Sequence, residues 1–270
     1  MSACPLCSGA LETAFHYDAR PEGETQFEIP PERYRRSYAQ CSTCGLYVAD
    51  LGGLDLDELY AGAYVDATYS ANGLSATFDR IMALAPERSD NAGRVARVVD
   101  WLGEPGARIL DVGSGLGVFP AGLRRAGQHA VVALDPDARA VEHTRGHAGV
   151  EAVLGDFMAA GELGLGRFEL VTLNKVLEHV PDPVAMLARV REHLEPGGAV
   201  YVELPDGEAA AQDPDGQGRE EFFIEHRYVF GPASLALLAR RAGFDVRRLE
   251  RLREPSGKYT VYAFLTPQTS

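Results

Sequence analysis

The sequence predicts an α/β fold, in which a doubly wound parallel sheet follows a small cysteine-containing module. From residue 108 onward, short apolar segments alternate with amphipathic ones, which is typical of parallel strands joined by crossover helices. A glycine-rich turn follows the first apolar segment, where such sheets bind ligands. The four cysteines all lie near the N-terminus as two Cys-x-x-Cys pairs. The length of 270 residues suits one ordinary domain with such an appendage.

The N-terminal module is predicted from the spacing of its cysteines. Two thiolates separated by two residues can point at one ion, and four thiolates favour tetrahedral Zn²⁺ in a closed structural site, whereas a catalytic zinc keeps an open position. The alternatives are free thiols or two disulfides, and a reducing compartment disfavours the disulfides. We therefore expect residues 1–55 to form a zinc-binding module with four ligands: Cys4, Cys7, Cys41 and Cys44.

Helices are expected where capping residues flank amphipathic segments. A short helix is predicted at 55–60, and Ser89 is the expected N-cap of a helix that Gly103 ends. We therefore assign residues 56–104 to a helical linker or cap. Asp182 is the expected N-cap of a helix that ends in the Glu-Pro-Gly-Gly sequence at 195–198. The last predicted helix starts near Pro232 and stops at Gly243.

Strands are expected where apolar residues cluster between turn signals. Five of them are predicted to be parallel, and the last two form an antiparallel hairpin around the Pro-Ser-Gly sequence at 255–257. The predicted strands are 108–112, 130–134, 151–154, 168–173 and 199–204, followed by the hairpin strands 244–250 and 259–266.

The glycine-rich turn lies between the first strand and its helix, over residues 109–117. A bare glycine loop is weak evidence for any one ligand, because NAD enzymes use one too. Here the third glycine of the dinucleotide pattern is replaced by Val118, and the Gly-Lys-Ser/Thr of a phosphate-binding P-loop is absent. Asp111 stands just before the loop, where a carboxylate can help organise a cationic amino-acid group.

Residues 89–266 resemble class I S-adenosylmethionine (SAM)-dependent methyltransferases, beginning with the sequence Asp-Val-Gly-Ser-Gly at 111–115. Three further segments match in the expected order: an acid ending the second strand, Gly-Asp-Phe at 155–157, and 173–180 after the fourth strand. The resemblance implies a Rossmann-like, seven-stranded methyltransferase sheet. It also implies a SAM site built from Asp111, Gly113, Ser114, Gly115, Gly117, Asp135, Pro136, Asp156, Phe157 and Asn174.

The acidic residues of this site have separate expected roles. Asp135 is expected to accept hydrogen bonds from both ribose hydroxyls. Asp156 can accept from the adenine N6 amine, and Phe157 can pack on the adenine ring. Each aspartate, taken alone, is also explained as a cap of the following helix. The segment 173–180 is expected to line the methyl-transfer cleft.

Histidines are the expected bases, because methyl transfer often requires the acceptor to lose a proton near neutral pH. His179 follows the fourth strand, and His226 lies in an insertion, 205–231, that we expect to be a lid. Glu225 is expected to hold one imidazole in a single tautomer and raise its basicity. Each histidine has a purely positional alternative. The remaining candidates are three tyrosines of the linker, Tyr60, Tyr64 and Tyr69, whereas three histidines are expected in solvent: His143, His147 and His193.

Charge limits the classes of partner. Twenty-six Lys and Arg against 39 Asp and Glu give a formal net charge of −13, which disfavours nucleic acid and anionic membrane surfaces. The sequence contains no apolar run long enough for a membrane span and no secretory signal. We therefore expect a cytoplasmic protein with a small-molecule partner.

The Glu225-His226 pair and His179 predict the class of reaction. The sequence around them looks similar to that of sugar C-methyltransferases. Small-molecule methyltransferases of sugar and natural-product pathways often carry a four-cysteine zinc module. We expect residues 105–270 to methylate a sugar, nucleotide-sugar or natural-product intermediate. The alternatives are an rRNA base methyltransferase with a zinc-binding RNA-recognition module and a non-catalytic SAM-binding scaffold. The flipped-base sequence Asn-Pro-Pro-Tyr/Phe is missing, since Lys175 follows Asn174.

Overall fold

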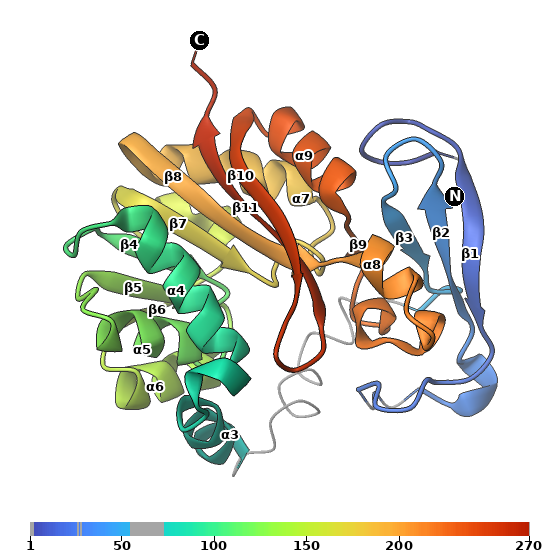
Figure 1. The fold of residues 1–270 in the computed structure, drawn as a ribbon, viewed down its shortest axis with the longest axis horizontal. Helices are drawn as coiled ribbons and strands as arrows, with labels where there is room; N and C mark the ends of the chain where they lie inside the picture. The colour runs from blue at the N-terminus through green and yellow to red at the C-terminus, as the bar shows by residue number, and fades with distance from the viewer. Residues whose placement is uncertain (1–2, 26, 28, 55–72, 270) are drawn as a thin grey trace.

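The computed structural model describes residues 3–25, 27, 29–54 and 73–269, which form two sheets (Figure 1). The helix predicted at 55–60 and the tyrosines Tyr60, Tyr64 and Tyr69 lie outside these residues.

The larger sheet confirms all seven predicted strands. From one edge to the other it consists of β10 (Phe244–Arg253), β11 (Tyr259–Pro267), β8 (Leu194–Pro205), β7 (Phe168–Asn174), β4 (Ile109–Val112), β5 (Val131–Asp135) and β6 (Glu151–Leu154). The strands from β8 to β6 are parallel, and β11 is antiparallel to both of its neighbours, β8 and β10. The chain runs outward from β4 to β6 and then returns to β7 on the other side of β4. This reversal places the ligand site at the carboxyl end of β4.

Helices cover both faces of this sheet (Figure 1). One face carries α4 (Asp90–Leu102), α5 (Val118–Arg125) and α6 (Ala138–His147), with α3 (Gly73–Met82) outside them, and the other carries α7 (Pro183–Arg189) and α9 (Pro232–Arg241). On β4, Ile109 packs in the cluster that holds Val98 of α4, whereas Leu110 packs in the cluster that holds Leu187 of α7. Successive strand residues thus point to opposite faces, and both faces are apolar because both are covered.

The predicted helix boundaries are confirmed where a capping side chain sets them. The Ser89 hydroxyl accepts a hydrogen bond from the Ala92 amide at 3.1 Å, and Gly103 ends α4 with a φ of 72°. The Asp182 carboxylate accepts from the Ala185 amide at 2.9 Å. Short 3₁₀ helices occupy Pro31–Arg33, Pro86–Arg88, Phe157–Glu162, Val190–His193, Gly216–Gly218 and Glu220–Phe222.

The prediction that the helix after Asp182 continues to residue 195 is wrong. The α-helix ends at Arg189, and β8 already begins at Leu194, which pairs with Phe168 of β7. The apolar Leu194 is buried by the strand pairing and not by a helix face. At Gly198, a Cβ atom would lie 3.0 Å from the Phe168 carbonyl oxygen, so this glycine permits the close strand approach.

Two of the three histidines expected in solvent are buried. His143 lies under α3, with its ring 5.4 Å from that of Phe78, and His193 packs 5.5 Å from the ring of Phe157. His147 is exposed, as predicted. The physical reason for His143 is that α3, which was not predicted, covers the outer side of α6, whereas His193 is buried by its packing against Phe157.

The smaller sheet forms most of the N-terminal module. Its antiparallel strands are β1 (Leu11–Tyr17), β2 (Arg36–Cys41) and β3 (Tyr47–Asp50), followed at the edge by β9 (Tyr228–Val229). The last strand comes from the insertion at 205–231, which also contains α8 (Gly207–Ala211) (Figure 1). The insertion therefore joins the two sheets, and the lid role that we expected for it stays a prediction.

The aromatic ring of Phe222 anchors the insertion to the module. Phe222 is fully buried, and its ring lies between 4.8 and 5.3 Å from those of Phe15, Tyr38 and Tyr47. Edge-to-face packing of this kind adds to the stabilisation from buried apolar area.

We predict that Phe222→Ala lowers the free energy of unfolding by about 3–5 kcal/mol, because it leaves a cavity between the insertion and the module. Leu154→Ala, on the exposed side of β6, is the control and should change stability by no more than about 0.5 kcal/mol. Urea unfolding followed by circular dichroism measures both. A loss below about 1 kcal/mol for Phe222→Ala would show that the ring is not an anchor.

Candidate active site

The loop after β4 requires glycine for two separate reasons. Gly113, Gly115 and Gly117 have φ values of 71°, 50° and 74°, in the left-handed region that glycine adopts without strain. A Cβ atom would lie 2.8 Å from Val176 at Gly113 and 2.6 Å from Thr144 at Gly117. At Gly115 a Cβ atom would meet nothing within 4 Å, so the backbone there is open to the adjoining cavity.

Asp135 ends β5 and is fixed against this loop. Its carboxylate accepts hydrogen bonds from the amides of Gly115, at 2.8 Å, and Asp137, at 2.9 Å. Burial raises the pKa of Asp135, and these two amide donors oppose that shift. The carboxylate is therefore held at the carboxyl end of β5, where it contacts the cavity together with Pro136.

Asp111 lies beneath the loop and does not contact the cavity. Its carboxylate accepts from the Thr172 hydroxyl at 2.6 Å and from the Asn174 amide at 2.9 Å. Burial raises the pKa of Asp111 to about 7. The Asn174 side chain contacts the cavity, and its Oδ1 has no hydrogen-bond partner among the described residues. Asp111 thus orients Asn174, whereas the sequence suggested that it meets the cofactor directly.

One cavity of about 870 Å³ joins the loop to the predicted catalytic residues. At one end it contacts Gly113, Ser114, Gly115, Asp135, Pro136, Asp156, Phe157 and Asn174, and at the other Glu178, His179, Glu225 and His226. Of the expected cofactor residues, Asp111 and Gly117 are not in its lining. The Ser114 hydroxyl is buried and, like Asn174 Oδ1, has no hydrogen-bond partner in the described part of the chain.

The two predicted catalytic histidines lie together, with ring centroids 5.0 Å apart. Nδ1 of His179 is 2.9 Å from the Glu225 carbonyl oxygen, and Nδ1 of His226 is 2.8 Å from that of Glu221. A carbonyl oxygen only accepts, so each Nδ1 carries the proton and each Nε2 is the basic nitrogen. Burial lowers the pKa of both imidazoles, well below the usual range for His226.

The structure adds backbone groups to the predicted role of the Glu225 carboxylate. The sequence suggested that this carboxylate fixes the tautomer of one imidazole and raises its basicity. The structure assigns the tautomer of His226 to the backbone carbonyl of Glu221, and Glu225 contributes its own carbonyl to His179. Burial makes both imidazoles weaker bases than usual, although the charge of the Glu225 carboxylate opposes this shift at His179.

Glu178 is the functional residue that the sequence analysis missed. It is 0% exposed, and neither carboxylate oxygen has a hydrogen-bond partner among the described residues. Burial raises its pKa to about 8, although nearby Lys175 opposes the shift. The dipeptide Glu-His did not single it out in the sequence, because it occurs four times, at 142–143, 178–179, 192–193 and 225–226.

Lys175 carries an unusual backbone conformation beside this site. Its φ is 57°, a region that non-glycine residues rarely adopt and that often marks functional sites. The Lys175 amide donates to the Glu203 carbonyl at 2.9 Å, and its Nζ donates to the Thr260 hydroxyl at 3.1 Å. Burial lowers the pKa of the Lys175 amine.

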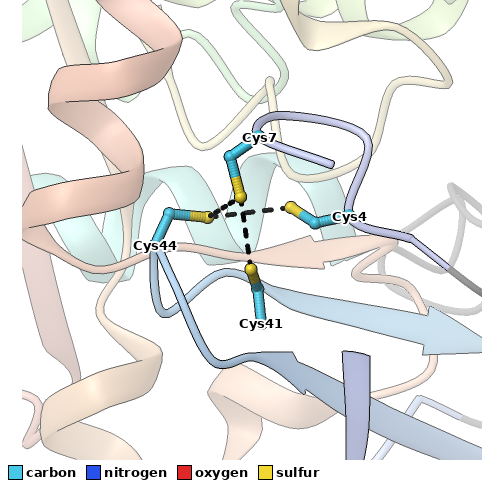
Figure 2. Close-up of side chains that lie close together, drawn as sticks. All are labelled: Cys4, Cys7, Cys41 and Cys44. Carbon is cyan, nitrogen blue, oxygen red and sulfur yellow. Dashed lines mark hydrogen bonds between the residues drawn. The ribbon is translucent and has the colours of Figure 1, made fainter. Parts of the chain in front are cut away.

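The four cysteines form a separate cluster in the module, with their side chains pointing toward one another (Figure 2). Their Sγ atoms lie 3.7 Å apart for Cys4 and Cys44, 3.3 Å for Cys7 and Cys41, and 3.6 Å for Cys7 and Cys44. No disulfide joins any two of them. On the far side of the turn at 4–7, the Arg241 side chain of α9 donates to the carbonyls of Pro5 and Leu6 at 2.6 and 2.7 Å.

Comparison with known proteins places this geometry in a family. Residues 82–249 match the family described as "Methyltransferase domain". The ubiquinone biosynthesis O-methyltransferase of Xanthomonas campestris pv. campestris is 36% identical over 126 residues, which are 44% of this chain and 49% of that protein. The same enzyme from Xanthomonas axonopodis pv. citri is 30% identical over 200 residues, which are 66% of this chain and 83% of that protein. The chain spans about half the length of the first of these relatives.

Solved structures share the fold. The 1,6-didemethyltoxoflavin-N1-methyltransferase of Burkholderia thailandensis, with bound 1,6-didemethyltoxoflavin and S-adenosylhomocysteine (SAH), has a TM-score of 0.57 at 21% identity and covers 93% of this chain and 100% of that one. The glycopeptide N-methyltransferase MtfA, complexed with SAM, has a TM-score of 0.54 at 20% identity. This match covers 66% of this chain and 94% of that one. Within the described residues, no helix has the length and apolar character to cross a membrane. The match to the family over residues 82–249 covers more than half of the chain, so the chain belongs to the methyltransferase domain family.

Proposed function

We propose that the chain transfers a methyl group from SAM to a small-molecule acceptor. The observation that carries this proposal is the single cavity, about 870 Å³ in volume, that connects the glycine loop to the two histidines. Ligand cavities usually measure about 300–1,000 Å³, so this one has room for the cofactor and a small acceptor side by side. Among the fold neighbours, MtfA is complexed with SAM, and the toxoflavin enzyme holds SAH beside a small heterocycle.

The loop end of the cavity suits SAM. The backbone at Gly113 and Gly115 is open to the cavity, Asp135 would accept from the ribose hydroxyls, and Asp156 would accept from the adenine amine. Phe157 would pack on the adenine ring beside Pro136. The unpartnered oxygens of Ser114 and Asn174 are available to the methionine part of the cofactor. Asp111 and Gly117 act indirectly, by orienting Asn174 and by packing against Thr144.

The histidine end of the cavity suits the acceptor. SAM supplies an electrophilic methyl group on a sulfonium, and the acceptor must approach in line with the carbon–sulfur bond and lose a proton. We propose that Nε2 of His226 or His179 takes that proton, while Glu225 positions His179 through its carbonyl oxygen. We propose a sugar, nucleotide-sugar or natural-product intermediate as the acceptor. The named substrates of the toxoflavin and glycopeptide enzymes support this class.

We propose that the four cysteines hold one structural Zn²⁺. Sulfurs at the corners of a tetrahedron with Zn–S bonds of about 2.3 Å lie about 3.8 Å apart, close to the separations found here. The amides of Gly9 and Thr43 donate to Cys7 and Cys41 sulfurs at 3.4 Å, as expected for thiolates. We also propose a cytoplasmic location, because two Cys-x-x-Cys pairs are typical of metal ligands in a reducing compartment.

We propose residues 1–55 as the zinc-binding module and 105–270 as the transferase, because β1, β2 and β3 lie in the first range and all seven strands of the larger sheet lie in the second. The segment 56–104 between them contains α4, which packs against α5 of the transferase. Methyl transfer itself does not pass through the zinc, whose role is to hold the module together.

Loss of the ribose acceptor should weaken cofactor binding. We predict that Asp135→Ala costs about 1.5–3 kcal/mol of SAM binding free energy, because a charged acceptor of two hydroxyls is removed. This corresponds to a Kd increase of roughly 10- to 150-fold. Titration calorimetry with SAM and SAH measures the change, and Asp245→Ala, which removes an exposed carboxylate, is the control. Wild-type affinity in Asp135→Ala would refute the assignment.

Zinc removal should damage the module more than the cofactor site. We predict about one zinc per chain by elemental analysis of protein purified under reducing conditions. The Cys41→Ser variant should lose the metal, and its smaller sheet should unfold at a lower urea concentration, while the Kd for SAM changes little. Ser42→Ala, beside the ligand, is the control. Metal-free protein with a fully native fold would contradict the zinc proposal.

Loss of the basic imidazole should slow catalysis. We predict that His226→Ala or His179→Ala lowers kcat by about 10²–10⁴-fold, the usual contribution of general-base catalysis, with little change in SAM affinity. The acceptor is first found by screening nucleotide-sugars, natural-product intermediates and RNA. His147→Ala, on an exposed face of α6, is the control. The base assignment fails if both variants keep near-normal kcat from pH 6 to 9.

Methylation of RNA alone, steeply reduced by salt, would instead favour the rRNA alternative.

A further inference from the structure

Three proton-binding side chains meet at the acceptor end of the cavity. One carboxylate oxygen of Glu178 and one ring nitrogen from each of His179 and His226 all lie within 4.8 Å of one another. The backbone fixes this arrangement, because the amides of Arg227 and Tyr228 donate to the Glu178 carbonyl at 2.8 and 3.2 Å. The segment that carries His226 is thereby tied to the end of β7.

The two imidazoles can exchange a proton only through Nε2. Each Nδ1 already donates its proton in a hydrogen bond to a backbone carbonyl oxygen. A carbonyl oxygen accepts this hydrogen bond but does not take up the proton. An imidazole that takes the acceptor's proton on Nε2 therefore becomes a buried cation. Burial disfavours this cation. The charges of Lys175 and Arg227 at His179, and of Lys175 and Lys258 at His226, disfavour it further, whereas the charge of Glu225 favours it at His179.

Burial acts in the opposite direction on Glu178. A buried carboxylate is disfavoured relative to the neutral acid, so its affinity for a proton rises. The charged groups that face it are Lys175 after β7 and Arg94 on α4, which favour the anion, and Glu203 on β8, which disfavours it. The pKa of Glu178 is raised to about 8, above those of both imidazoles, which fall below 6.5.

We propose that Glu178 is the final proton acceptor of the methyl transfer, which rests on the function proposed above. The acceptor's X–H bond breaks, its electron pair attacks the methyl carbon, and the carbon–sulfur bond breaks to leave neutral SAH. The proton moves to an imidazole Nε2 and then to the Glu178 carboxylate, restoring the neutral imidazole. Glu178 later returns the proton to water. The Glu178 carboxylate is thus the strongest base of the cluster, and the histidines transfer the proton to it.

The order of proton affinities can be measured without an acceptor. In protein labelled with ¹³C at glutamate carboxyl carbons, we expect one resonance to titrate near pH 8 and to vanish in Glu178→Gln. The imidazole nitrogens of His179 and His226 should stay neutral at pH 7. Protonation of either imidazole at a higher pH than Glu178 would overturn the proposal.

The pH dependence of catalysis tests the proton path itself. Only ionised Glu178 can take a proton, so kcat/KM of the wild type should rise with pH and level off above about pH 8. Glu178→Gln should lower it by about 10²–10⁴-fold and abolish this rise. Glu178→Asp, which keeps a carboxylate, should restore part of the rate with the rise at a shifted pH. Glu192→Gln, at an exposed site, is the control.

The two proposals fail in different ways. If SAM does not bind the wild type in calorimetry, the proposed function itself is wrong. If the wild type binds SAM and methylates its acceptor, but Glu178→Gln keeps the same pH profile, only the role of Glu178 is wrong. Should Glu178→Gln fail to fold, an unshifted profile in Glu178→Asp has the same meaning.

Discussion

The pairing of β9 with β3 is the contact on which the geometry of the acceptor site depends. It carries a segment of the transferase into the sheet of the N-terminal module, where Val229 pairs with Tyr47. Directly before β9, the Tyr38 hydroxyl donates to the carbonyl of His226 at 2.6 Å, and the Glu24 carboxylate accepts from the Ile224 amide at 2.8 Å. A fully buried ion pair between Glu24 and Arg36, along with a bond from the Tyr34 hydroxyl, holds that carboxylate in place. The module therefore positions a predicted catalytic residue, and Cys41 of the cysteine cluster ends β2, one of the strands that do so.

The same burial that positions these groups also sets their proton affinities. A carboxylate and two imidazoles share a water-poor wall of one cavity, and each is shifted toward its neutral form. A neutral wall suits methyl transfer from a sulfonium, because the reaction consumes a positive charge on sulfur and releases a proton. Positively charged imidazoles facing the sulfonium would oppose its binding. The neutral imidazoles thus favour the approach of the cation, whereas removal of the proton requires the ionised form of Glu178.

The sequence was informative where local patterns determine structure. Buried strands such as β4 and β5 are continuous apolar segments, and Ser89, Asp182 and Gly103 mark helix ends through their own hydrogen bonds or backbone angles. The start of β8 was misplaced because burial of Leu194 fits a helix face and a strand equally well. The pairing of β9 with β3 could not be predicted, since a two-residue strand has no periodicity and its partner is about 180 residues distant. Glu178 was missed because its importance comes from residues brought near by that pairing.

The central claim is that the cofactor's sulfur faces a cluster positioned by the N-terminal module. A crystal structure of the protein with bound SAH tests this most directly. The account predicts the ribose hydroxyls on Asp135 and the thioether sulfur directed toward His179, His226 and Glu178, with β9 still paired to β3. A sulfur directed away from these three residues, or a His226 segment detached from the module in the complex, would contradict the account.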